Sequence, residues 1–172
     1  MRTSTQHPHR RSAPRGFTVF FAVLVSSLAL AVGLALYDLL SRELVLSQTT
    51  TQSQYAIYAA DTGAECALYW DSKYVGSSGL TSGFASSTTS TTGTNMLCNG
   101  VDVSTLWGTP QKTATAATTT FTLSLGSATG PCAIIIVAKN GDPSKTTITS
   151  RGYNTCQSGG LVRLERTLQI NY

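Results

Sequence analysis

The chain contains one long apolar run, from Phe17 to Tyr37, that carries no charged side chain over twenty-one residues. At about 1.5 Å of rise per residue, a helix of this length covers roughly 30 Å, the thickness of the hydrocarbon core of a bilayer. A buried helix of a soluble domain rarely stays apolar on every face for so long. The run therefore predicts a membrane-spanning helix.

Basic residues are concentrated before this run. Arg2, Arg10, Arg11 and Arg15 lie in the first sixteen positions, where no acidic residue occurs, whereas the rest of the chain has eight basic and eight acidic residues. The net charge of +4 thus belongs to a short N-terminal arm, which argues against a nucleic-acid-binding surface on a folded domain. Because positively charged flanks remain in the cytoplasm, the chain after the run is expected to be exported.

Composition narrows the chemistry that the chain can perform. Both histidines, His7 and His9, lie in the basic arm, so the remaining sequence has no histidine for a Ser-His-Asp or Cys-His site. No short spacing of carboxylates singles out a pair for general acid–base catalysis. Asp61 and Glu65, one helical turn apart, are expected to serve in capping or as surface residues, with a cation site as the less favoured alternative. We expect no enzyme activity and no cofactor.

The four cysteines, Cys66, Cys98, Cys132 and Cys156, all follow the apolar run. None has CxxC spacing and no histidine is available nearby, so we expect no metal site. An even number in an exported domain favours two disulfides, for which three pairings are open. We prefer Cys66 with Cys98, which would tether a helix end to the far side of a loop, and Cys132 with Cys156, which would staple neighbouring strands. Reduced structural cysteines are the alternative.

The helix is expected to continue beyond the apolar run to about Trp70, because the sequence after Tyr37 has no Pro and only one Gly, Gly63, over this distance. Thr49 to Thr51 and Gly63 are points where it can bend or fray. An apolar stripe on one face of its second half is expected to pack against a sheet. The stripe consists of Ile57, Ala60, Ala64, Ala67 and Leu68.

The remainder of the chain reads as a loop followed by strands. From Gly76 to Gly93 it is almost entirely Ser, Thr and Gly, with Leu80 and Phe84 as isolated apolar residues, which predicts a long mobile loop. Alternating or continuously apolar segments predict four antiparallel strands over 118–125, 132–139, 145–153 and 161–172. The expected fold is α+β: a long N-terminal helix packed in its second half on a C-terminal antiparallel sheet of about four strands.

The stretch from Arg15 to Phe21, RGFTVFF, resembles the processing site of type IV pilins and pseudopilins. In that family a basic leader ends in Gly, a prepilin peptidase in the membrane cuts after it, and the new N-terminal residue, usually Phe, is N-methylated. The resemblance implies cleavage between Gly16 and Phe17 and methylation of Phe17. The mature chain would then have 156 of the 172 residues.

The sequence departs from the family pattern at Phe21, the fifth residue after the implied cut, where most major pilins carry Glu. In the family that carboxylate pairs with the amino terminus of a neighbouring subunit, a pair that Phe21 cannot make. Its loss is tolerated in some minor pilins, notably those placed at the fibre tip. The resemblance therefore implies a minor, tip-associated or priming subunit.

A second block, Ala59-Ala60-Asp61-Thr62-Gly63, resembles a stretch common in minor pilins of the PilX-like kind. In those proteins the small residues let the helix lie close to its sheet. The resemblance covers about the first third of the chain. With the patterns of the remainder, it divides the sequence into a basic leader (1–16), a transmembrane helix (17–37), an exported continuation of the helix (38–72), a Ser/Thr/Gly-rich loop region (73–117) and the sheet of the globular head (118–172).

The resemblance implies a structural subunit of a type IV pilus or a related secretion pseudopilus. Its expected partners are other pilin-like subunits, the prepilin peptidase, a membrane assembly platform and cytoplasmic membrane lipids. The chain would cross the cytoplasmic membrane once, with its N-terminus in the cytoplasm, and after assembly would lie in an extracellular pilus or an envelope-spanning pseudopilus. The alternative is a single-pass anchored surface protein that binds carbohydrate or another protein without assembling into a fibre.

Overall fold

The computed structural model describes residues 15–76, 80–90, 92–141, 145–157, 159 and 162–172, and residues 1–14 of the expected leader (1–16) lie outside them. The chain divides into two compact units, an N-terminal unit that ends at Ser47 and a C-terminal unit from Gln48 to Tyr172. One helix, α1 (Arg15–Lys73), contributes to both. Each unit is described in turn.

The N-terminal unit consists, in its described part, of the first half of α1. The two serines of the apolar run are satisfied within the helix: Ser26 Oγ donates to Ala22 O at 2.8 Å and Ser27 Oγ donates to Leu24 O at 2.9 Å. Such bonds leave neither serine with a free hydroxyl hydrogen on the apolar surface. The helix runs without interruption through Thr49–Thr51 and Gly63, so these positions do not end it.

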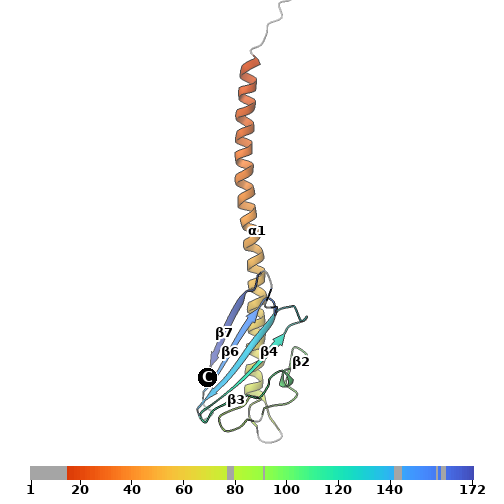
Figure 1. Cartoon of the computed structure of the whole chain (residues 1–172), viewed down its shortest axis with the longest axis vertical. Helices are drawn as coiled ribbons and strands as arrows, with labels where there is room; N and C mark the ends of the chain where they lie inside the picture. The colour runs from red at the N-terminus through yellow and green to blue at the C-terminus, as the bar shows by residue number, and fades with distance from the viewer. Residues whose placement is uncertain (1–14, 77–79, 91, 142–144, 158, 160–161) are drawn as a thin grey trace, which may run out of the picture. The chain divides into compact units, whose positions relative to one another are not determined.

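The C-terminal unit contains a five-stranded antiparallel sheet in the order β3-β4-β5-β6-β7 (Figure 1). The strands are β3 (Gln111–Lys112), β4 (Ala116–Ser124), β5 (Cys132–Asn140), β6 (Thr146–Tyr153) and β7 (Glu165–Asn171). The α+β fold is as expected, but the sheet has five strands instead of about four. The additional strand, β3, pairs through only two residues, too few to give a periodic signal in the sequence.

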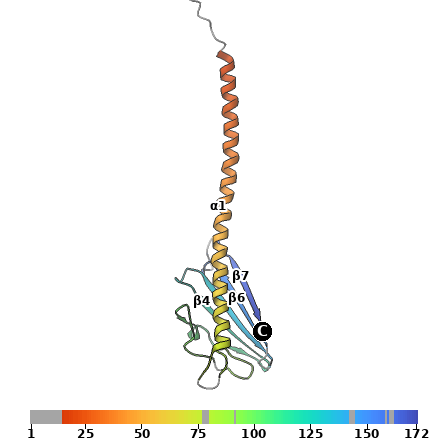
Figure 2. The same ribbon diagram turned by 180° about the vertical axis from the view of Figure 1, so that it is seen from behind.

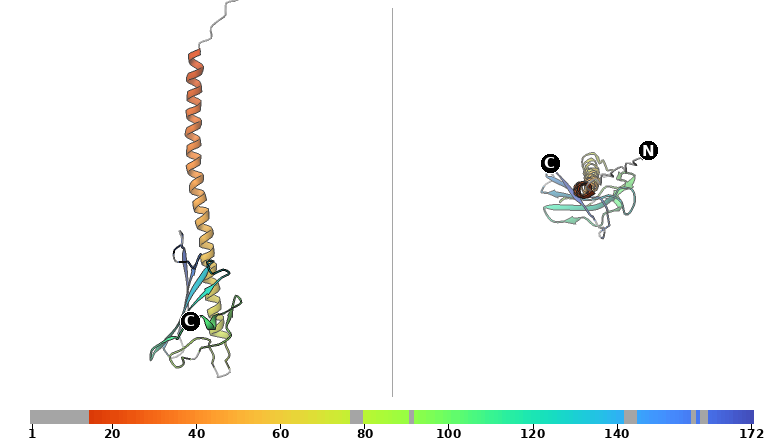
Figure 3. Two further views of the ribbon diagram at one scale, coloured as in Figure 1. Left: turned by 45° about the vertical axis from the view of Figure 1, so that its right-hand side comes forward. Right: turned by 90° about the horizontal axis from the view of Figure 1, so that it is seen from above.

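The second half of α1 lies over one face of this sheet, as the views from behind and from above show (Figures 2 and 3). The strand register places inward-facing side chains of neighbouring strands in rows beneath the helix. One row joins Phe121, Ile135 and Ser150, and the next joins Thr119, Val137 and Ile148. All six are at most 2% exposed, so these rows form the core between helix and sheet.

The opposite face of the sheet points to solvent and is rich in hydroxyl groups. Its half-buried or exposed threonines are Thr118, Thr120, Thr122, Thr147, Thr149 and Thr167. Arg151 and Glu165 are the charged side chains of this face on strands β4 to β7, and their Nε and Oε1 atoms lie 3.9 Å apart. Hydroxyl groups, more than charged groups, therefore form the hydrogen bonds of this surface with water.

The contact between α1 and the sheet is made by residues with little or no side chain. Ala56, Ala59, Ala60, Ala64 and Ala67 are at most 2% exposed. Ile57, expected in the packing stripe, is instead 45% exposed, whereas Leu68 is half-buried against the core. The stripe is rotated because the helix approaches the sheet too closely for a side chain the size of isoleucine.

The region between α1 and β4 is more ordered than its composition predicts. It forms a two-stranded sheet of β1 (Leu97–Cys98) and β2 (Val101–Asp102), followed by the short 3-10 helix η1 (Val103–Thr105). Phe84, expected to be an isolated apolar residue of a mobile loop, is 1% exposed. Its ring centroid lies 6.0 Å from that of Phe121 and 5.7 Å from that of Trp107, so this segment adds an aromatic layer to the core.

Two disulfides, Cys66–Cys98 and Cys132–Cys156, join the cysteines in the pairing preferred from the sequence. The first links α1 to β1, and the second links the start of β5 to the chain that follows β6. Each closes a loop of some tens of residues, which stabilises the folded state by restricting the unfolded chain.

Candidate functional site

The most unusual feature of the described chain is the uncovered apolar surface of α1 in the N-terminal unit. The most apolar eighteen-residue window of the helix has a mean hydropathy of 2.6, and none of it is buried. By length and composition, α1 can cross a membrane. In water such a surface would be costly to expose, at roughly 25 cal/mol per Å² of apolar area. It therefore requires a lipid or protein environment.

The expected processing junction lies at the beginning of this helix. Gly16 and Phe17 are both within α1, and Phe17 is 71% exposed. A Cβ atom at Gly16 would meet no atom within 4 Å, so the helix itself does not require glycine there. The ring of Phe21 stacks on that of Phe17 with centroids 6.4 Å apart.

One face of the same segment is hollowed by small residues. A shallow groove there is lined by the small residues Ala22, Ser26 and Ala29, spaced by about one helical turn, together with Phe17, Thr18, Phe21 and Val25. Grooves of this kind allow two helix backbones to approach closely in a membrane. The face can therefore accept a second helix.

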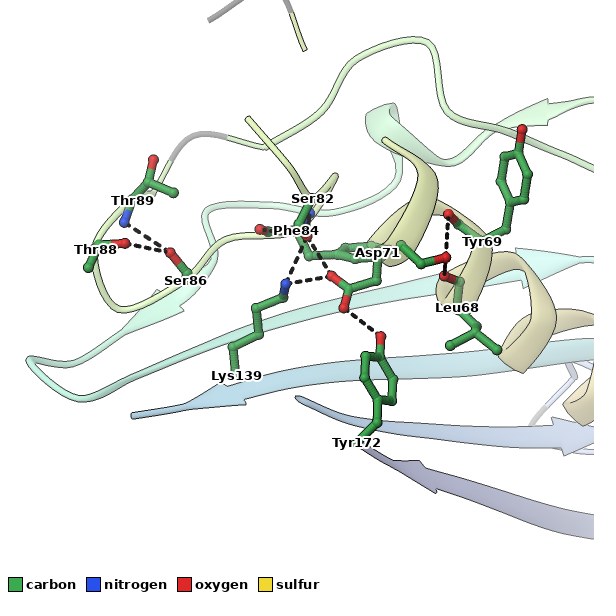
Figure 4. A network of polar contacts seen from close by, with 11 residues as sticks. Leu68, Tyr69, Asp71, Ser82, Phe84, Ser86, Thr88, Thr89, Lys139 and Tyr172 are labelled. Atoms are coloured by element: carbon green, nitrogen blue, oxygen red, sulfur yellow. Dashed lines mark hydrogen bonds and ion pairs between the residues drawn. The ribbon is translucent and has the colours of Figure 1, made fainter. Parts of the chain in front are cut away.

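The C-terminal unit holds a buried ion pair that the sequence analysis did not anticipate (Figure 4). Lys139 Nζ lies 2.5 Å from Asp71 Oδ1, and the two side chains are 9% and 4% exposed. Ser82 Oγ donates to the same carboxylate oxygen at 2.5 Å, and Tyr172 Oη donates to Oδ2 at 2.5 Å. Four separate segments therefore meet at one carboxylate: the end of α1, the following loop, β5 and the last residue of the chain.

The electrostatics of this cluster keep Asp71 ionised. Burial alone would raise the pKa of its carboxyl group, but the hydrogen bonds from Lys139, Ser82 and Tyr172 and the charge of Lys139 together lower the pKa below the ordinary 3.8. Burial and the hydrogen bond to Asp71 raise the pKa of the Tyr172 phenol well above its usual 10. The cluster is fully paired, which suits a structural clamp.

The sequence contained one indication of the cluster around Asp71 and Lys139. Ala133, Ile135, Val137 and Lys139 alternate along β5 and so face the same side, which places a lysine in a row of buried residues. A buried lysine needs a carboxylate partner. Nothing in the sequence indicated that the partner would be Asp71, because the two residues come from distant elements.

Other candidate ligand groups remain apart. Asp61 and Glu65 are exposed, and within the described part of the chain no group of three or more His, Cys, Asp or Glu side chains lies close enough to hold a metal ion. The four cysteines are used in disulfides. No protein-family model, curated protein sequence or solved structure matches this chain.

Proposed function

We propose that the protein is a structural subunit of a type IV pilus or of a related secretion pseudopilus. It is processed between Gly16 and Phe17 and assembled through the apolar half of α1. The observation that carries this proposal is the unburied apolar helix, which follows an arginine-rich arm and contains the Gly16–Phe17 junction in its first turn. The family resemblance of the RGFTVFF stretch agrees with this arrangement.

The physical basis of assembly would be an exchange of lipid contacts for helix contacts. Lipid tails are as apolar as the helix surface, so association depends on close packing of backbones and not on the hydrophobic effect. Small residues supply that packing: Ser26, Ser27, Ala29, Ala31 and Gly33 lie within the apolar segment, and Gly33 has open space where a Cβ would stand. The groove over Ala22, Ser26 and Ala29 offers one face for a neighbouring helix.

The C-terminal unit supports an exported location. Two disulfides staple it, and disulfides persist in oxidising compartments outside the cytoplasm. An arrangement with basic residues on the cytoplasmic side places this unit on the other side of the membrane. It would be the part of the subunit that faces the surroundings of the fibre.

We also propose a minor position in the fibre, at the tip or in priming, because Phe21 stands where most major pilins carry glutamate. An ionised glutamate in the bilayer costs about 3 kcal/mol in membrane insertion and is retained where a neighbouring amino terminus pairs with it. A subunit with Phe21 avoids this cost and lacks the pair, so it suits a place with no subunit beyond it.

Leader removal is the first test. Intact-mass measurement of the chain produced with its prepilin peptidase is expected to show loss of the first sixteen residues and gain of one methyl group on Phe17. Gly16→Leu should block the cut, while Gly33→Leu, also at a position where a Cβ meets no atom within 4 Å, should leave it unchanged. A leader retained in the native chain would overturn the proposal in favour of an anchored surface protein.

Position in the fibre is the second test. Immunogold electron microscopy of a tagged copy is expected to place label at fibre tips and not along the shaft. Label along the shaft would contradict the minor role but support incorporation. Fibres without any label, from cells that contain the processed protein, would reject incorporation itself.

A further inference from the structure

A groove on the C-terminal unit lies between the end of α1 and the β1–β2 hairpin. Its volume is about 400 Å³, within the range typical of ligand sites. Thr62, Glu65, Tyr69 and Trp70 line it from the helix, and Leu97 and Asn99 line it from the hairpin. It is separate from the apolar half of α1 used in the proposed assembly.

The two walls of this groove are fixed to each other. The Cys66–Cys98 disulfide joins helix and hairpin at the groove, and Trp70 Nε1 donates a hydrogen bond to Leu97 O at 3.2 Å. Asn99 and Gly100 form the tight hairpin turn with φ values of 48° and 76°, in the left-handed region that such turns require. A ligand would therefore meet a preformed site and would lose little free energy in ordering it.

Two aromatic rings form a corner in the groove. The rings of Tyr69 and Trp70 are nearly perpendicular, at 85°, with centroids 5.1 Å apart. Tyr69 is 56% exposed although it borders a hollow in the surface. An exposed ring held in this way offers a flat face for stacking.

The polar groups of the groove are available to a ligand. Among the described residues, neither the Glu65 carboxylate nor the Asn99 side-chain amide has a hydrogen-bond or ion-pair partner. Thr62 Oγ1 donates its hydrogen to Tyr58 O, so it offers only lone pairs to the groove. The site thus presents an aromatic face next to strong acceptors and one amide that both donates and accepts.

We propose that this groove binds a carbohydrate, with one sugar ring stacked on Tyr69 and its hydroxyls bonded to Glu65 and Asn99. A sugar matches the groove because it combines an apolar C–H face with a rim of hydroxyls. The residues that line the groove include a carboxylate and no cationic side chain, which selects neutral or amino sugars over acidic ones. This role is additional to the fibre subunit and does not depend on assembly.

The test uses the full chain in detergent on an array of neutral, amino-bearing, sialylated and sulphated glycans, followed by titration of the best ligand. Binding to neutral or amino glycans is expected. Tyr69→Ala should weaken it at least about tenfold and Glu65→Gln several-fold. Tyr58→Ala is the matched control, because Tyr58 is 65% exposed on the same helix and does not line the groove.

Three outcomes would overturn the carbohydrate site: no glycan bound, preference for sialylated or sulphated glycans, or equal losses for Tyr58→Ala and Tyr69→Ala. Asn99→Gly provides a second variant in case Tyr69→Ala unfolds, because glycine removes the amide and keeps the left-handed backbone, and unchanged thermal unfolding shows that each variant is folded. Absence of glycan binding by the native chain, together with normal leader removal and fibre label, would refute this site alone and leave the proposed subunit role intact.

Discussion

Gly152 on β6 lies so close beneath Ala60 on α1 that a Cβ atom on the glycine would overlap the backbone nitrogen of the alanine. The same Cβ atom would also overlap the carbonyl oxygen of Ala56. Helix and sheet therefore touch backbone to backbone at this point. Gly63, one turn further along α1, repeats the close approach against Ser150, Ala133 and Ile135.

Replacing Gly152 by alanine is expected to lower the free energy of unfolding by about 3 kcal/mol or more, since backbone atoms block the added methyl group and can move only if the helix shifts. Gly108→Ala is the control, because a Cβ there meets no atom within 4 Å, and it should change stability by less than about 1 kcal/mol. Urea unfolding of the full chain in detergent, followed by circular dichroism, measures both. A Gly152→Ala variant as stable as the native chain would contradict the close contact.

The Asp71–Lys139 pair gives a second prediction. Asp71→Asn leaves the Lys139 ammonium buried without its counter-charge and should cost about 3 to 5 kcal/mol. In the double variant Asp71→Asn with Lys139→Met no buried charge remains, so most of that loss should be recovered. Chemical unfolding of the native chain and both variants measures the difference. Equal losses in the single and double variants would show that the pairing is unimportant.

Acid should weaken the same cluster. Because the pKa of Asp71 is lower in the folded than in the unfolded chain, the unfolded chain binds the proton first. The stabilisation is therefore complete above the unfolded value of about 3.9 and is lost as pH falls through the folded value. Unfolding measured between pH 6 and pH 2 should show this loss, and the double variant without the pair should lack it.

Alkali should act through Tyr172, whose pKa is raised in the folded chain. Its stabilisation is fully present below the unfolded value of about 10 and is lost as pH rises toward the folded value. Tyr172→Phe should reduce this dependence, of which Tyr153 keeps a part because its pKa is also raised by burial, and should cost about 1 to 2 kcal/mol at neutral pH through the lost hydrogen bond to Asp71. Unfolding curves from pH 7 to pH 11 test this. Identical alkaline sensitivity in the variant would exclude Tyr172 as the responsible group.

Removing the Cys66–Cys98 disulfide by a double replacement with serine should cost about 3 to 4 kcal/mol, from the entropy of a loop with a sequence separation of 32. Removing Cys132–Cys156 should cost a similar amount, since its separation is 24. The distinguishing measurement is glycan binding, which only the first replacement should weaken, because only Cys66 and Cys98 lie at the groove.

The sequence allowed the main elements to be predicted because their patterns are long. The apolar run and the alternating segments specify a helix and strands through periodicity, and the four longer strands of the sheet begin or end within a few residues of the expected bounds. The preferred cysteine pairing also agrees with the structure. The short strands β1, β2 and β3 could not be predicted, since two residues carry no period.

The features that could not be predicted depend on contacts between residues far apart in the sequence. Ile57 matched the periodic stripe but lies outside the contact, because the deciding factor is the backbone approach at Gly152, which a helix pattern does not contain. Phe84 looked isolated because its aromatic partners, Trp107 and Phe121, are far away in sequence. Asp71 and Lys139 each appeared ordinary, and only the fold brings them together.

The outer face of the sheet, which is rich in threonine, affects how the solubility of this unit depends on salt concentration. Salt screens the repulsion between charged surfaces, with a Debye length that falls from about 30 Å at 0.01 M to about 3 Å at 1 M. Hydroxyl groups bind water through hydrogen bonds, and ionic screening does not weaken these bonds. We therefore expect the solubility of this domain to depend less on ionic strength than that of a domain with a highly charged surface.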